Sequence, residues 1–132
     1  MSNENLSKNM RYAYKTSFLL IDHEPKGNIH TIRNKQVMLD RDLAEMYDVE
    51  TKALNQAVKR SRERFPKKYI FQLNKHEINS MVSQNAIPSK QHLGESNPYA
   101  FTEQGVSMLS AVLKSKRAIE ISIKIIDAFV EI

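Results

Sequence analysis

The stretch Leu39–Arg60, LDRDLAEMYDVETKALNQAVKR, decides the fold because it predicts two short helices in succession. Four residues fall on one face of the first helix at helical spacing: Leu39, Leu43, Ala44 and Tyr47. Asp40 precedes this helix, where its carboxylate can cap unpaired N–H groups, and Asp42 suits the positive end of the helix dipole. We expect the first helix to end near Asp48.

The second helix is expected to begin at Glu50 or Thr51 and to run to about Arg64. Its predicted buried stripe consists of Leu54, Ala57, Val58 and Ser61. Pro66 stops this helix, because Phe65, as the residue before a proline, is pushed out of helical geometry.

Together the two predicted helices have the layout of a helix-turn-helix. The small Ala44 allows the second helix to approach closely, and Asp48 occupies the turn, where aspartate tolerates a left-handed backbone. Val49 is expected to plug the corner, while Leu54 and Val58 close the core from the second helix.

The charge of the chain is concentrated in one segment. The 132 residues have a net charge of +5, yet Thr51–Lys68 alone holds seven basic residues and one acidic residue. The basic residues are Lys52, Lys59, Arg60, Arg62, Arg64, Lys67 and Lys68. A solvated helix face is one interpretation of this segment, and a polyanion contact, most often nucleic acid, is the other.

The exposed face of the second predicted helix combines amides with cations. Asn55 and Gln56 can pair bidentately with adenine edges in a major groove. Lys52, Lys59 and Arg60 can contact phosphate or guanine. Arg62, Arg64, Lys67 and Lys68 continue past the helix and are expected to follow the phosphate backbone. The alternative is a polar surface face that reads no bases.

Outside this stretch, four runs of β-branched and apolar residues predict strands: Ser17–Asp22, Asn28–Arg33, Gln36–Leu39 and Tyr69–Leu73. A hairpin is expected around Asn34-Lys35. Tyr69–Leu73 favours a core strand over a wing behind the basic helix, and Pro98–Phe101 predicts a short extended piece. Residues 1–16 are expected to form a flexible tail that precedes a single domain over residues 17–132.

Helices dominate the second half of the chain. Asn74 and Glu77 have the spacing of a capping box before a helix that runs to about Gln84. Thr102 is expected to cap the next helix, in which Gly105 permits close approach of another element. Ile119–Ile132 favours a helix by its length, and such an apolar helix is buried or packs against a second subunit. The predicted class is therefore α+β, a small sheet packed with a helix-turn-helix and C-terminal helices.

Several function classes are not expected from the composition. The absence of cysteine excludes a disulfide framework, a thiolate zinc site and a cysteine nucleophile. The four histidines, His23, His30, His76 and His92, lack ligand spacing, so neither a metal site nor a cofactor is expected. We expect no catalytic residues and no enzyme activity. No run of apolar residues is long enough to span a membrane. Residues 1–15 are polar and lack the apolar region of a signal peptide, so a cytoplasmic protein is expected.

Three motifs in order resemble one known family: Met38-Leu39-Asp40-Arg41-Asp42-Leu43-Ala44, Phe65-Pro66 after a basic helix, and Ala100-Phe101-Thr102-Glu103-Gln104-Gly105. Over roughly Ile29–Ile132 the chain resembles the KilA-N superfamily, most closely the amino-terminal domain of phage antirepressor-like proteins, the open-reading-frame-six branch. The resemblance implies an α+β DNA-binding domain, often fused to a C-terminal effector domain.

The expected function is therefore a double-stranded DNA-binding regulator of transcription, of phage or mobile-element origin. Its second helix would enter the major groove, and the basic segment that follows would contact phosphates. The alternative is a protein-interaction module of the antirepressor type, which binds a repressor or self-associates through the C-terminal apolar helix. The apolar segment Ile119–Ile132 could bind such a partner or equally form a homodimer.

Overall fold

The computed structural model of the protein describes residues 25–89 and 96–132. The predicted strand at Ser17–Asp22 and the predicted tail over residues 1–16 lie outside the described residues. The described elements are, in order, the 3-10 helix η1 (Pro25–Asn28), β1 (Ile29–Ile32), β2 (Lys35–Leu39), α2 (Asp40–Tyr47), α3 (Thr51–Arg60), the 3-10 helix η2 (Arg62–Arg64), β3 (Ile70–Gln72), α4 (Lys75–Ser83), β4 (Tyr99–Phe101), α5 (Glu103–Leu113) and α6 (Lys116–Val130). The predicted α+β class is confirmed.

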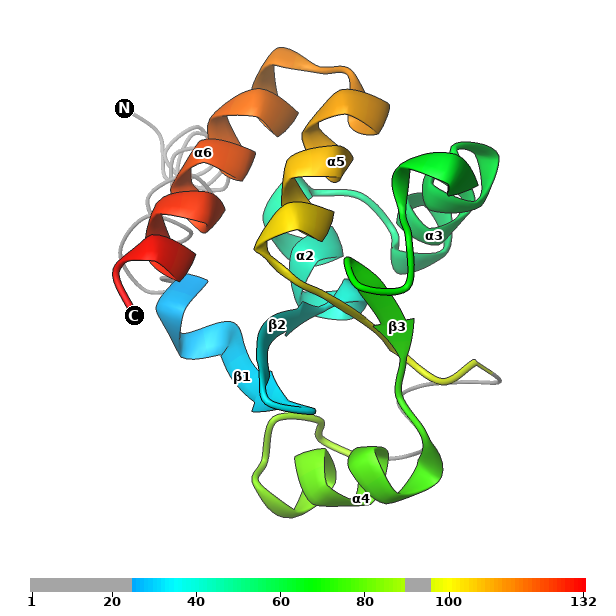
Figure 1. The fold of residues 1–132 in the computed structure, drawn as a ribbon, viewed down its shortest axis with the longest axis vertical. Helices are drawn as coiled ribbons and strands as arrows, with labels where there is room; N and C mark the ends of the chain where they lie inside the picture. The colour runs from blue at the N-terminus through cyan, green and yellow to red at the C-terminus, as the bar shows by residue number, and fades with distance from the viewer. Residues whose placement is uncertain (1–24, 90–95) are drawn as a thin grey trace, which may run out of the picture.

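A four-stranded antiparallel sheet in the order β1-β2-β4-β3 separates two cores. Its central strands are buried on both faces, because side chains alternate along a strand. Met38 and Phe101 join the larger core with α2, α3, α5 and α6, whereas Val37, Leu39 and Ala100 join the smaller core with α4. Figure 1 shows α4 at one end of the molecule and the α5–α6 pair at the other.

The β1–β2 hairpin is confirmed, but its turn lies one residue earlier than predicted. Ile32 pairs with Lys35, so the two-residue loop is Arg33-Asn34. Both loop residues adopt positive φ, 56° and 61°, as type I′ hairpin turns require. The sequence favoured Asn34-Lys35 because these two polar residues separate the β-prone runs Asn28–Arg33 and Gln36–Leu39.

The junction between α2 and α3 consists of three residues, and its left-handed turn is confirmed. Asp48 has φ 57° and ψ 45° and donates its N–H to Glu45, while the N–H of Val49 bonds the Ala44 carbonyl. The inward residues Leu43, Ala44, Leu54 and Val58 are buried. Val49, however, is 38% exposed and does not plug the corner, so that prediction was wrong.

Helix α3 is shorter than predicted, because it ends at Arg60 and gives way to the tighter turn of η2. Of its predicted buried stripe, Leu54 and Val58 are buried, while Ala57 and Ser61 are only half-buried. Phe65 has φ −124° and ψ 71°, outside the helical region, as predicted for the residue before Pro66.

The predicted caps of the later helices are confirmed. Asn74 and Glu77 form a reciprocal capping box at the start of α4. The Thr102 hydroxyl accepts a hydrogen bond from the N–H of Gly105 at 3.3 Å and caps α5. Strand β3 pairs with β4 and buries Ile70, so the core-strand interpretation of Tyr69–Leu73 is confirmed over Ile70–Gln72.

Helix α6 confirms the helical interpretation of the C-terminal segment, but only one side of it is buried. Ser122 and Ile125 face the core, and the Ser122 hydroxyl lies 2.6 Å from the Tyr47 hydroxyl of α2. Burial raises the pKa of Tyr47 to about 12, so both groups remain neutral hydroxyls at physiological pH. Ile119, Ile123, Val130 and Ile132 are more than half exposed.

The close approach predicted at Gly105 is confirmed and yields a test of the fold. A Cβ at this position would lie 2.5 Å from the Tyr69 carbonyl oxygen, which is held by hydrogen bonds from the Thr102 N–H and hydroxyl. We expect Gly105→Ala to lower the free energy of unfolding by about 1–3 kcal/mol through overpacking, measured by urea denaturation. Gly27→Ala is the matched control, because nothing lies within 4 Å of its added Cβ. Equal stability of the two variants would contradict this packing argument.

Candidate nucleic-acid interface

The predicted basic residues lie on one continuous stretch of the chain and are all exposed. Lys52, Gln56, Lys59 and Arg60 lie on the solvent side of α3, and Arg62, Arg64, Lys67 and Lys68 follow on η2 and the segment that leaves it. Leu54 and Val58 hold the opposite side of α3 in the core. The amphipathic pattern therefore turns one polar, basic side of α3 to solvent, and Glu63 is the one acidic residue of Thr51–Lys68.

Asn55 differs from the other predicted site residues, because it turns toward the interior. Its side-chain amide donates to the Asp40 carboxylate, with 2.9 Å between Asn55 Nδ2 and Asp40 Oδ2. Its Oδ1 atom is buried and has no hydrogen-bond partner within residues 25–89 and 96–132. The amide therefore does not present a donor and acceptor side by side to solvent, which bidentate pairing with adenine needs. Base reading by Asn55 stays a prediction that this conformation does not favour.

Asp40 is the buried anchor of this region, and it lies within the first turn of α2 instead of preceding the helix as predicted. It is the first residue of α2, only 3% exposed, and Leu39 occupies the cap position without a side-chain bond. The Asp40 carboxylate accepts from Asn55 and from two backbone N–H groups, those of Arg41 at 2.7 Å and Tyr99 at 3.2 Å. It therefore joins α2, α3 and β4.

Burial shifts both carboxyl groups at the start of α2. Desolvation raises the pKa of Asp40, and the hydrogen bond from Asn55 opposes this rise most strongly. Desolvation also raises the pKa of Asp42, to about 6, with Arg41 opposing the shift and Glu45 and Asp40 adding to it. Hydrogen bonds hold the Asp40 carboxylate, whereas Oδ2 of Asp42 is buried without a hydrogen-bond partner among the described residues.

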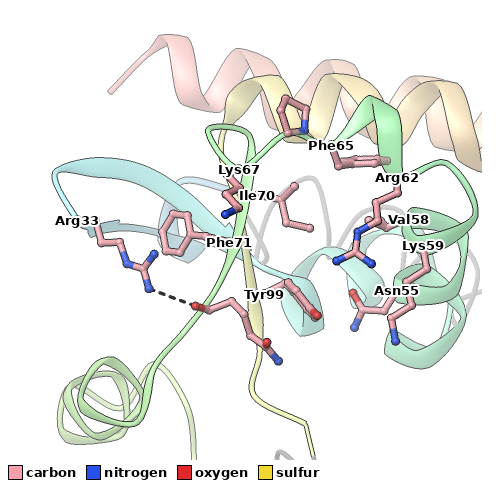
Figure 2. A pocket seen from close by; sticks show the side chains of 12 residues that line it. Arg33, Asn55, Val58, Lys59, Arg62, Phe65, Lys67, Ile70, Phe71 and Tyr99 are labelled. Atoms are coloured by element: carbon pink, nitrogen blue, oxygen red, sulfur yellow. Dashed lines mark hydrogen bonds between the residues drawn. The ribbon is translucent and has the colours of Figure 1, made fainter.

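A hollow of about 510 Å³ borders α3 beside Lys59 and is enclosed by α3, η2, β3 and β4. Figure 2 shows Ile70 and Tyr99 between Lys67 on one side and Arg62 on the other. Four basic side chains line this hollow, and its lining includes no carboxylate: Arg33, Lys59, Arg62 and Lys67. We name it the basic hollow.

Arg33 is the contribution to this surface that the sequence analysis missed. Its guanidinium bonds both carboxylate oxygens of Glu77, at 2.8 and 2.9 Å, and the Gln72 carbonyl at 3.2 Å. It also lies 4.2 Å from the centre of the Phe71 ring. Arg33 comes from a turn 18 residues before the basic segment begins. No local sequence signal indicates this position, because only folding of the sheet brings Arg33 beside Phe71 and Gln72 of β3.

The described residues offer little for other kinds of site. In residues 25–89 and 96–132, no cluster of three histidine or carboxylate side chains has the geometry to hold a metal ion. Within the same ranges, no helix has the length and hydropathy to span a membrane. His23 and His92 lie outside the described residues.

The bond between Asn55 and Asp40 generates a test. Asn55→Ala removes the side-chain donor of a buried carboxylate, so we expect the free energy of unfolding at pH 7 to fall by about 1.5–3 kcal/mol. Loss of this bond raises the pKa of folded Asp40 further. The stability deficit should therefore shrink as the pH falls through that pKa and the carboxyl becomes neutral. Gln56→Ala is the exposed control and should change stability by less than about 0.5 kcal/mol. A deficit that is the same at every pH would contradict this assignment.

Comparison with known proteins agrees with the motifs and the fold. The family described as ORF6N domain matches residues 27–112, which is most of the described chain. No curated protein and no solved structure matches this chain. The matched range includes the sheet, α2, α3, the basic segment and nearly all of α5. The chain therefore belongs to the ORF6N domain family, a phage-type regulatory family of the kind that its motifs predicted.

Proposed function

We propose that this chain is a regulator that binds double-stranded DNA through α3 and the basic segment Thr51–Lys68. The observation that carries the proposal is the concentration of charge: seven cations and one carboxylate in a segment whose basic side chains are all exposed. A duplex is a dense array of phosphates, and neutralising them releases condensed counterions. Membership of the ORF6N family supports a regulatory role for the domain.

In this proposal α2 and α3 act as a helix-turn-helix. Helix α3 enters the major groove with its exposed side, while α2 supports it from behind through the Leu43, Leu54 and Val58 packing. Arg62, Arg64, Lys67 and Lys68 then lie along one strand and contact its phosphates. The three-residue junction with its left-handed Asp48 supports this assignment.

Base reading is assigned chiefly to Gln56, because its amide is exposed on the outer side of α3 between Lys52 and Lys59. The side-chain amide of Asn55 donates to Asp40, and we assign Asn55 to holding α3 in place. Lys52 and Arg60 flank Gln56 and can reach either guanine or phosphate.

Binding to duplex DNA at low salt, followed by fluorescence anisotropy across a salt series, tests the proposal. The slope of log affinity against log salt should be about −0.9 for each phosphate contacted. Replacing Lys59 and Arg60 with Ala should weaken binding to all sequences and make the slope shallower by about 2. Selection from a random duplex library should return a different preference for Gln56→Ala.

The matched control for this experiment is Lys35→Ala with Lys75→Ala, which removes the same charge from exposed positions on β2 and α4. Equal weakening by the control would mean that net charge alone drives binding. Undetectable binding at low salt would contradict the proposal. A protein partner captured equally well by a charge-reversed Lys59–Lys68 variant would favour the antirepressor-type alternative.

We also propose that two copies associate through α6. Ile119, Ile123 and Val130 are 53%, 55% and 69% exposed and recur at i, i+4 and i+11, which forms one stripe along the helix. Three large aliphatic side chains in a line are unusual on a monomer surface. A homodimer would supply the two-fold symmetry with which helix-turn-helix proteins commonly bind paired half-sites.

Light scattering over a range of concentrations tests the association. The wild-type chain should be a dimer, and Ile123→Lys should shift it to monomer while the far-ultraviolet circular dichroism stays unchanged. Ala111→Lys, at an exposed apolar position on α5, is the control and should leave the dimer intact. A wild-type chain that is monomeric at the concentrations used for nuclear magnetic resonance would overturn this proposal.

A further inference from the structure

The basic hollow has a composition that phosphate contact alone does not require. Its cations surround an apolar floor, because the buried side chains of Val58, Phe65 and Ile70 also line it. Two aromatic rings, Phe71 and Tyr99, complete the lining. A volume of about 510 Å³ is far larger than one phosphate group and falls in the range of small-molecule sites.

The charges around this floor are available for a ligand. Lys59, Arg62 and Lys67 are exposed, and none of them forms a salt bridge within the described residues. Arg33 differs, since Glu77 neutralises it, and it holds the Phe71 ring in place by stacking. The hollow therefore presents three free cations on its rim and a fixed cation–aromatic pair on one wall.

One polar atom in the lining of the hollow is also unsatisfied. Oδ1 of Asn55 is buried and has no hydrogen-bond partner among the described residues. Figure 2 shows the hydroxyl end of Tyr99 directed toward Asn55. The backbone of Tyr99 and the side chain of Asn55 are both fixed by their bonds to Asp40. The hollow is thus a preorganised site that offers stacking, a hydroxyl and cations within one small space.

We propose that the basic hollow binds one nucleotide, with its phosphate on Arg62 and Lys59, its base against Tyr99 and the apolar floor, and Lys67 on the opposite rim. Aromatic side chains stack on bases while neighbouring cations hold the phosphate. A paired base cannot reach such a floor without leaving its stack, at a cost of a few kcal/mol. The ligand is therefore an unpaired nucleotide of a DNA strand or a free nucleotide. This inference deepens the proposed DNA binding, since it names what a second part of the same surface contacts.

The test compares three probes by nuclear magnetic resonance titration: inorganic phosphate, deoxyribose 5-phosphate and deoxyadenosine monophosphate. The nucleotide should bind about 5- to 150-fold more tightly than inorganic phosphate or deoxyribose 5-phosphate, because base stacking on an aromatic side chain adds roughly that factor in affinity. It should also shift the backbone amides of Ile70, Phe71 and Tyr99. A nucleotide that binds no better than phosphate would overturn the inference.

Two charge-matched double variants locate the site. Arg62→Ala with Lys67→Ala removes two rim cations and should weaken nucleotide binding about tenfold, whereas Arg64→Ala with Lys68→Ala removes two neighbours outside the hollow and should weaken it less than about twofold. Equal effects of the two variants would also overturn the inference.

The source of the nucleotide is separated by comparing a blunt duplex with one that has a single unpaired nucleotide at one end. Tighter binding of the overhang identifies a strand nucleotide as the ligand, and equal affinities identify the free nucleotide. Blunt-duplex binding without nucleotide binding overturns this inference and leaves the proposed function standing. Nucleotide binding without duplex binding overturns the proposed function and leaves the nucleotide site standing.

Discussion

The carboxylate of Asp40 is the interaction on which the arrangement of this domain depends. An ionised group so deeply buried is strongly destabilising unless hydrogen bonds satisfy it. Three donors do so, and they come from α2, α3 and β4. The position of α3 relative to the sheet follows from this requirement, because any displacement of the helix would strip the carboxylate of its amide donor. Asn55 and Tyr99 both line the basic hollow, so its floor is held by the same carboxylate.

The elements that local signals specify were predictable from the sequence. The capping box of α4, the cap of α5 and the left-handed Asp48 each depend on a few neighbouring residues, and each is confirmed. Local signals were insufficient where a distant contact decides. The sequence assigned Asp40 to a cap because of its place at the start of a helix. Its carboxylate does accept the first-turn N–H of Arg41, but it also accepts from Asn55 and from the β4 backbone, which no local signal indicated. Val49 looked like a core residue by type, but the turn leaves it at the surface.

The candidate interface was predictable to the same extent. Its basic segment is contiguous in sequence, and amphipathic spacing alone turns those cations outward. Spacing could not separate Asn55 from Gln56, because adjacent helical residues differ by only about 100° in direction and the inward partner of Asn55 is 15 residues away. The contribution of Arg33 and the basic hollow could not be predicted from the sequence for a related reason. The hollow forms only when folding brings the β1–β2 turn beside β3.

In the proposed DNA-binding dimer, the hydroxyl pair of Tyr47 and Ser122 would help to set the distance between the two DNA half-sites. This buried bond fixes the rotation of α6 about its own axis against α2, and α2 in turn packs on α3. In a dimer joined through α6, contacts would run without interruption from the two-fold axis to both copies of α3. In such a dimer the distance between the two copies of α3 would be fixed by the packing of α6, α2 and α3. Half-sites moved apart by a base pair or two would turn the second one away around the duplex, so spacing would be selected as strictly as base identity.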